Sequence, residues 1–233
     1  KYRATQVYEW LKKGSNIDGM HNNDPRFVEG TKPVSHLSFD EAAELAYFGA
    51  KILHPTCILP AKVNNIPVRL LNTMDPTAHG TIISARQCDR RIAAIAAKDN
   101  ITAIKIKSGR MLLAYGFLRK VFEIFERYKT PIDMITTSEV GVSLTIDNNR
   151  HLDDIIDDLK KYGTVEVDKD HVIICIVGNL ISSGQGFANL IFDALKDIPI
   201  RMISYGGSDH NISILINAED KVQALRSLSA KLF

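Results

Sequence analysis

The strongest constraint on the fold is an internal repeat in the later part of the chain, at an offset of about 70 residues. Gly116-Phe117 recurs as Gly186-Phe187, residues 132–135 (IDMI) recur as 200–203 (IRMI), and residues 142–146 (VSLTI) recur as 212–216 (ISILI). A repeat of this size indicates two copies of one supersecondary unit. In the first copy the patterns run strand, helix, strand, strand, helix, strand, which is the ferredoxin-like split βαβ arrangement.

The two copies differ in their number of strand patterns. The first copy has four, at residues 101–106, 132–137, 142–146 and 165–167. The second has three, at residues 172–177, 201–205 and 212–216, before a helical pattern over 218–232. A complete second sheet therefore needs a strand from upstream, and the apolar segment 92–97 is unassigned. We predict that this segment pairs with 172–177 or 212–216, so that the first copy is inserted within the second.

The chain before residue 90 has a different pattern. Ser38 precedes Glu41 by three residues, which is a capping-box spacing at the start of an apolar helical stripe. Pro55 is expected to end that helix. Other elements are predicted here over residues 1–14 (helix), 60–65 (helix) and 67–72 (buried strand). After residue 90, a helix is predicted over 117–128, with Leu118, Val121, Phe122 and Phe125 inward. Together the patterns predict an α/β (α+β) chain that divides near residue 90.

Composition excludes several classes of protein. Lys+Arg is 29 and Asp+Glu is 27, so the net charge of +2 gives no electrostatic footprint for nucleic acid. The longest apolar runs have six residues, against the ~20 of a membrane span. Cys57, Cys88 and Cys175 form no metal or disulfide spacing, so we expect a reducing cytoplasm. An acid run at residues 153–158 is more typical of a solvated helix face than of a cation site.

The two copies diverge where a ligand could bind. Asp133 of the first copy corresponds to Arg201 of the second, and Ser138-Glu139 corresponds to Gly206-Gly207. Ionised carboxylates only accept hydrogen bonds, so Asp133 and Glu139 suit the amines of a cationic ligand. From the residues alone, exposed turn residues without a ligand are an equally good interpretation.

Several strings resemble the aspartate kinase (aspartokinase) family, most closely its monofunctional, lysine-sensitive type. They are residues 17–26 (IDGMHNNDPR), 39–55 (FDEAAELAYFGAKILHP), 66–68 (IPV), 136–140 (TTSEV) and 204–211 (SYGGSDHN). The resemblance implies a C-terminal piece of an amino-acid kinase fold over residues 1–90, followed by two ACT domains. The first ACT domain would occupy residues 99–170, and the second residues 91–98 plus 171–233.

The resemblance also implies a reaction that this chain does not perform alone. Aspartokinases transfer phosphate from ATP, with Mg²⁺, to the β-carboxylate of L-aspartate, the first step toward lysine, threonine and methionine. The family's Lys-Phe-Gly-Gly-Thr-Ser motif is absent here, so the chain lacks the catalytic half and is expected to be inactive alone. Family nucleotide contacts correspond to Arg26 and Lys51, and His21 stands where the family has tyrosine.

The family's lysine site is implied in the first ACT domain, at Met111, Gly116, Phe117, Leu118, Ile132, Asp133, Ser138 and Glu139. The helix start at Gly116 suits the effector's α-carboxylate. Pairing of ACT domains implies a homodimer or higher assembly. Two alternatives stay open. One is a fragment of a bifunctional aspartokinase–homoserine dehydrogenase, which the end of the sequence at Phe233, just after the last predicted helix, makes less favoured. The other is a free-standing ACT sensor without kinase activity.

Overall fold

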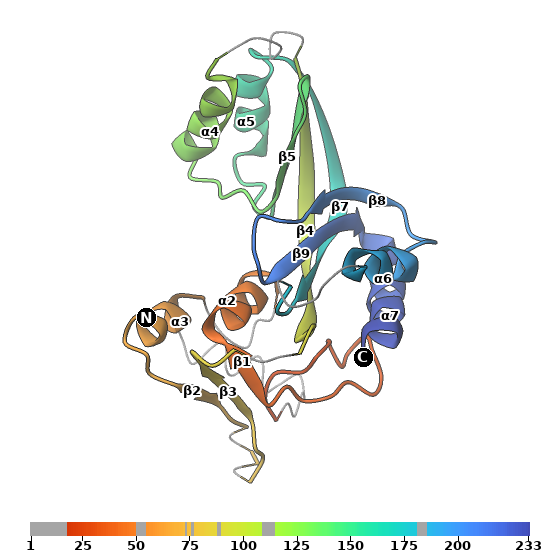
Figure 1. Cartoon of the computed structure of the whole chain (residues 1–233). Helices are drawn as coiled ribbons and strands as arrows, with labels where there is room; N and C mark the ends of the chain where they lie inside the picture. Colours follow the sequence, from red (N-terminus) through yellow and green to blue (C-terminus); the bar gives the residue numbers. More distant parts are fainter. Residues whose placement is uncertain are drawn as a thin grey trace.

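The computed structural model describes residues 18–49, 55–72, 74–75, 77–87, 90–108, 115–180 and 186–233. The predicted helix over residues 1–14 and two predicted site residues, Lys51 and Met111, lie outside these ranges. Within them the chain forms a small three-stranded sheet with two helices at one end and a six-stranded sheet with the remaining helices (Figure 1).

The small sheet belongs to the part of the chain before residue 90. Its elements are β1 (His36–Ser38), α2 (Phe39–Tyr47), α3 (Pro55–Val63), β2 (Val68–Leu70) and β3 (Thr81–Ser84), with strand order β1-β3-β2. The predicted capping box is confirmed: Ser38 Oγ accepts from Glu41 N at 3.1 Å, and Ser38 N donates to Glu41 Oε2 at 2.8 Å. This reciprocal pair satisfies two donors at the start of α2.

Three predictions for this region were wrong in detail. Helix α2 ends at Tyr47, before Pro55, and Pro55 is the first residue of α3. Proline suits a first helical position because its missing N–H has no helical acceptor there. The predicted helix over 60–65 is therefore the second half of a longer one. Strand β2 is also not buried, since Arg69 at its centre is exposed.

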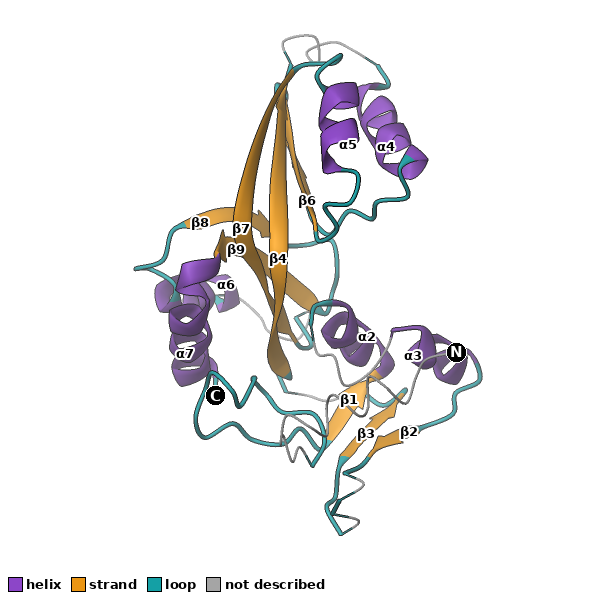
Figure 2. Cartoon of the chain, turned by 180° about the vertical axis from the view of Figure 1, so that it is seen from behind, coloured by secondary structure: helices purple, strands orange, loops and turns teal. Residues whose placement is uncertain are grey.

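The six-stranded sheet has the order β5-β6-β4-β7-β9-β8. Its elements are β4 (Ala94–Lys107), α4 (Phe117–Arg127), β5 (Ile135–Thr137), β6 (Gly141–Ile146), α5 (Leu152–Leu159), β7 (Thr164–Val177), α6 (Phe187–Ala194), β8 (Ile200–Ser204), β9 (Asn211–Asn217), η2 (Ala218–Asp220) and α7 (Lys221–Leu232). Figure 2 shows β4 and β7 running the length of this sheet, with α4 and α5 near one end and α6 and α7 near the other.

The predicted insertion of one unit in the other is confirmed by the strand register. Residues 94–98 of β4 pair with 173–177 of β7, while residues 102–107 of β4 pair with β6 of the first unit. The sequence predicted separate strands on each side of these joints, but β4 and β7 are each continuous over 14 residues. The exact domain boundaries stay a prediction.

A pair of bulges lets each long strand serve both units. Asn100 in β4 has φ 62° and Asp170 in β7 has φ 60°, the left-handed region that Asn and Asp tolerate best after glycine. Between Lys98 and Ile101 the register gains a residue on β4, and between Ile101 and Ala103 it gains one on β7. The two offsets cancel, so pairing continues in both directions.

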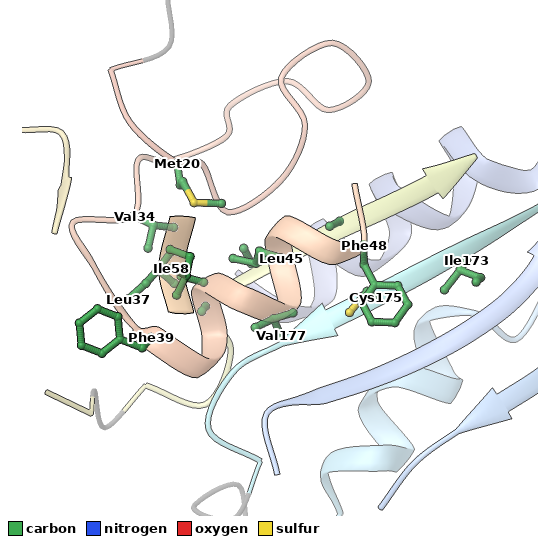
Figure 3. Packing of buried hydrophobic residues seen from close by; sticks show 14 of the residues in the cluster. Met20, Val34, Leu37, Phe39, Leu45, Phe48, Ile58, Ile173, Cys175 and Val177 are labelled. Atoms are coloured by element: carbon green, nitrogen blue, oxygen red, sulfur yellow. The ribbon is translucent and has the colours of Figure 1, made fainter. Parts of the chain in front are cut away.

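Both faces of the six-stranded sheet are buried around residues 172–177 of β7. Along β7, Ile173, Cys175 and Val177 point toward α2, as Figure 3 shows with Leu45 and Phe48. The alternate residues of β7 pack with α6 and α7. Burial on both faces explains the unbroken apolar run at residues 172–177.

Helix α4 presents a different face from the one predicted. Leu118 and Phe122 are 37% and 44% exposed, whereas Phe117, Val121, Ile124 and Phe125 are buried with α5 and β6. The two inward positions that the prediction shared with the structure are Val121 and Phe125.

We expect Gly49 to be essential for packing α2 against β4. It has φ 113°, and a Cβ there would lie 2.2 Å from the carbonyl oxygen of Ala97. Gly49→Ala should lower the free energy of unfolding in urea by about 1–3 kcal/mol more than Gly30→Ala. Gly30 is the matched control, because it also has a positive φ (70°) but nothing within 4 Å of a Cβ. Equal losses in the two variants would contradict the close approach.

Candidate functional site: a buried carboxylate at the junction

Four polar side chains from separate elements meet where the first ACT-like unit contacts helix α2. Asp133 lies just before β5, Lys98 is in β4, Asp147 follows β6, and Tyr47 is the last residue of α2. We call these four residues the Asp133 cluster. The Asp133 N–H donates to Thr145 O at 2.9 Å, which fixes the backbone of Asp133 beside β6.

The ammonium of Lys98 is the centre of this cluster. Its Nζ lies 2.6 Å from Asp133 Oδ1 and 2.9 Å from Asp147 Oδ2. Tyr47 Oη donates to Asp133 Oδ1 at 3.1 Å, and the Lys98 Nζ stands 4.5 Å from the Tyr47 ring centroid, a cation–π distance. The Asp133 side chain has no exposed area and that of Lys98 is 15% exposed. Asp133 Oδ2 is buried and has no hydrogen-bond partner among the described residues.

Burial and ion pairing oppose each other in this cluster. Burial raises the pKa of Asp133, and the hydrogen bond and charge of Lys98 offset only part of that effect. For Lys98, burial alone would lower the pKa, but hydrogen bonds to Asp133 and Asp147 outweigh it and raise the pKa. Burial and the Asp133 carboxylate also raise the pKa of Tyr47, so its hydroxyl remains a donor.

The predicted effector residues fall into two groups at opposite ends of β5. Ile132, half-buried, and Asp133 come before the strand, whereas Ser138 and Glu139 follow it, both exposed. Five extended residues at ~3.3 Å each place Ser138 roughly 16 Å from Asp133. The structure therefore does not bring Asp133 and Glu139 of one chain together.

The end of β5 that carries Ser138 is also where α4 begins. Gly116 caps α4 in the left-handed conformation with φ 80°, Phe117 is buried, and Leu118 is partly exposed. Ser138 N donates to Gly141 O at 2.8 Å. An open hollow of about 490 Å³ lies here, lined by Lys105, Lys107, Ser108, Ser138, Val140, Gly141 and Thr164. The ammonium of Lys107 is paired with Glu166 Oε1 at 2.6 Å. The ammonium of Lys105 and the hydroxyl groups suit an anionic group such as a carboxylate.

Sequence reasoning missed Lys98, Tyr47 and the two lysines of the hollow. Lys105 and Lys107 are two residues apart in one strand, and this spacing puts their side chains on the same face of the sheet. The spacing is visible in the sequence and could have identified them. No signal in the sequence pairs Asp133 with Lys98 or with Tyr47, because these contacts join separate elements across 35 and 86 residues.

Two of the predicted nucleotide contacts are described. Arg26 is held by Asp24, with Nη2 2.5 Å from Asp24 Oδ2 and Nε 2.9 Å from Oδ1, and the hydrogen bond to Asp24 raises its pKa. His21 Nδ1 lies 3.0 Å from Thr31 Oγ1, while His21 Nε2 is buried without a hydrogen-bond partner in the described part of the chain. The third contact, Lys51, lies outside the described residues.

No group of three or more His, Cys, Asp or Glu side chains among the described residues could hold a metal ion. The acid run at 153–158 includes Asp158, whose carboxylate is bound by Arg127, Lys161 and Tyr128. No helix within the described ranges has the length and apolar character to cross a membrane.

Comparison with known proteins places the chain in a family. A model of the amino acid kinase family matches residues 9–72, and a model of the ACT domain matches residues 174–232. A C-terminal domain from Porphyromonas gingivalis, assigned as the regulatory part of an aspartate kinase, is 59% identical over 60% of this chain and 96% of its own length (TM-score 0.55). The chain belongs to the aspartokinase family. The sequence resemblance, and with it the expected fold class, is confirmed.

Longer aspartokinases match most of this chain. Chloroplastic aspartokinase 3 of Arabidopsis thaliana is 39% identical over 94% of the chain, and lysine-sensitive aspartokinase 3 of Escherichia coli is 36% identical over 99%. The chain spans 41% and 52% of the lengths of these two relatives. The fold matches E. coli aspartokinase III with a TM-score of 0.87 in its complex with aspartate and ADP (R-state), and 0.82 in its complex with lysine and aspartate (T-state), covering about half of each chain.

We predict opposite titration behaviour for two aspartates of this aspartokinase chain. Because burial raises the pKa of Asp133, the folded chain holds that proton more tightly than the unfolded chain. The free energy of unfolding should therefore fall through Asp133 as pH rises from the ordinary aspartate range to the raised value. Asp158 is the internal control, since its hydrogen bond from Lys161 lowers its pKa. Carboxyl ¹³C NMR should give Asp133 the higher midpoint; the reverse order would mean that Lys98 outweighs burial.

Proposed function

We propose that this chain is the regulatory portion of an aspartokinase and that its effector is L-lysine. The observation that carries the proposal is the 59% identity to a domain assigned as an aspartate kinase regulatory domain, across nearly all of that domain. The likeness to E. coli aspartokinase III, whose T-state structure contains lysine, supports the choice of effector.

The whole protein, in this proposal, phosphorylates L-aspartate with ATP and Mg²⁺, and the present chain is inactive alone. Its share of the nucleotide site would be Arg26, His21 and Lys51. Of these, Arg26 already has a carboxylate partner in Asp24, so its guanidinium would contribute to nucleotide binding only after that pair rearranges. The described residues offer no acidic cluster for Mg²⁺, which would arrive with the nucleotide.

Lysine would bind the first ACT unit and not the second. The residues proposed to contact it are Met111, Gly116, Phe117, Leu118, Ile132, Asp133, Ser138 and Glu139. The start of α4 and the lysine-lined hollow suit the α-carboxylate, and the acids suit the amines. In the second unit Arg201 occupies the position of Asp133 and would repel an amine.

The two acids support a homodimer as the binding unit. Asp133 and Glu139 of one chain stand at opposite ends of β5, farther apart than the four-carbon stem of lysine can span. We infer that one lysine meets Asp133 of one protomer and Glu139 of its partner. An isologous pairing along β5, an edge strand of the described sheet, would bring such ends together.

Two other hypotheses about the whole protein are less well supported. A maize bifunctional aspartokinase/homoserine dehydrogenase is 30% identical, but this chain spans only 27% of it. A free-standing ACT sensor does not account for the amino acid kinase match over residues 9–72. A reducing compartment remains part of the proposal, since Cys57 and Cys175 are both free thiols.

We expect L-lysine to bind this chain through Glu139. Glu139→Gln should weaken binding by about 1.5–3 kcal/mol, roughly ten- to a hundredfold, because one charge-assisted hydrogen bond is lost. The matched control is Glu123→Gln, an exposed glutamate of α4 that pairs with Arg119 and should leave binding unchanged. Titration calorimetry measures both. Equal affinity of Glu139→Gln and the parent would place the effector elsewhere.

We also expect the chain to form a dimer through the first ACT unit. Val140, 54% exposed beside β5, should lie in the interface, so Val140→Asp should shift sedimentation equilibrium toward the 26.0 kDa monomer. Val63→Asp on α3 is the control, because Val63 is 76% exposed on the kinase part. A monomeric parent at micromolar concentration, with and without lysine, would contradict the assembly.

A further inference from the structure

The cation that Asp133 holds in this structure belongs to the chain itself. Lys98 presents a primary ammonium, the same group that a lysine effector would bring, and its Nζ lies 2.6 Å from Asp133 Oδ1. We propose that Lys98 is a resident ligand of Asp133, which an effector amine must displace in order to bind. This inference rests on the proposed function and specifies how the effector site is gated.

Asp133 is inaccessible while Lys98 is in place. The Asp133 side chain has no exposed area, and Oδ1 accepts from both Lys98 and Tyr47. The second oxygen, Oδ2, is buried with no partner among the described residues and so retains unused acceptor capacity. A carboxylate that is covered in this way binds an external amine only after the covering group moves.

Lys98 has an alternative partner in Asp147. Asp147 Oδ2 lies 2.9 Å from the same Nζ, and the Asp147 side chain is 34% exposed. When Lys98 leaves Asp133, its ammonium can stay paired with Asp147 and gain water. The exchange therefore leaves no buried charge unpaired, which is the condition that makes rearrangement of a buried ion pair feasible.

Tyr47 connects the Lys98–Asp133 pair to helix α2 of the kinase part. Tyr47 touches both members of the pair, by its hydroxyl on Asp133 and by its ring beneath Lys98. Its ring also packs edge-to-face on Phe48 with centroids 5.1 Å apart, and Phe48 is buried in the core between α2 and the sheet. Displacing Lys98 removes a contact from Tyr47, so binding at the effector site changes the contacts of the last residue of α2.

The junction that leads into the second ACT unit has the corresponding pair with the charges exchanged. At the repeat offset of about 70 residues, Lys98 corresponds to Asp168 and Asp133 to Arg201. Arg201 Nη2 lies 3.7 Å from Asp168 Oδ2, and both side chains are more than half exposed. The position therefore carries an ion pair in both units, but only in the first is the carboxylate buried beneath a displaceable ammonium. This counterpart provides a matched control.

Titration calorimetry of the full chain with L-lysine at pH 8 tests the inference. Lys98→Met removes the competing ammonium, so lysine should bind about tenfold or more tightly than to the parent, the scale of one charge-assisted hydrogen bond. Arg201→Met removes the corresponding cation of the second unit and should leave the affinity unchanged. Lys98→Met that binds lysine no more tightly than the parent would overturn the inference while leaving the proposed effector intact. Failure of both parent and Lys98→Met to bind lysine would overturn the effector proposal and the competition with it.

A second variant, Lys98→Ala with an added small amine, tests the proposal independently of any effect of Lys98→Met on folding. Lys98→Ala leaves space for a small amine, so n-butylamine should restore the competitor and weaken lysine binding to this variant. The same concentration should have a smaller effect on the parent, in which Lys98 already occupies the carboxylate. Equal effects of n-butylamine on the two proteins, or none on Lys98→Ala, would overturn the assignment of Lys98 as the resident ligand.

Discussion

The antiparallel pairing of β4 with β7 is the interaction on which the rest of the structure depends. Each strand runs through both ACT units, so one ladder of backbone hydrogen bonds joins two sheets into one of six strands. The alternation of side chains then assigns each face its cover: along β7, odd-numbered residues of 173–177 face α2, and even-numbered residues of 172–176 face α6 and α7. A slip of one residue would exchange these faces, so the paired bulges near residues 100 and 170 fix the position of the kinase helix as well as of the two units.

Helix α2 is attached to both units by polar contacts as well as by packing. Glu44 accepts from Ser208 Oγ at 2.8 Å and from Asn211 Nδ2 at 2.6 Å, which ties the helix to the second unit. Tyr47, one helical turn later on the same side, ties it to Asp133 of the first. If helix α2 has two positions, a ligand that binds either unit more tightly in one of them shifts the population toward that position. This difference in affinity is the thermodynamic requirement for allosteric coupling.

Short sequence patterns and the internal repeat made part of this arrangement predictable. The repeat, the missing strand and the Ser38–Glu41 capping box follow from patterns within about 20 residues or from direct self-similarity, and the structure confirms them. The continuity of β4 and β7 was not predicted, because Asn100 and Asp170 are typical turn residues and only tertiary pairing holds them inside strands at positive φ. The same holds for the site. Asp133 and Glu139 could be selected as acids, but strand direction separates them, and the burial of Asp133 beneath Lys98 and Tyr47 depends on contacts between distant segments.

The exchanged ion pair explains why divergence between the repeats falls at these positions. Each junction has a polar pair beside the segment that enters an edge strand: Lys98 with Asp133 in one, and Asp168 with Arg201 in the other. Exposure makes the second pair nearly neutral to stability, because surface ion pairs contribute little. Burial gives the first pair a large desolvation cost that only good geometry and extra hydrogen bonds can offset, and Asp133 Oδ2 has no hydrogen-bond partner in the part of the chain that the structure describes. Among the described residues, the first pair therefore combines burial with a carboxylate oxygen that has no partner, and that oxygen is the acceptor available to an incoming ammonium.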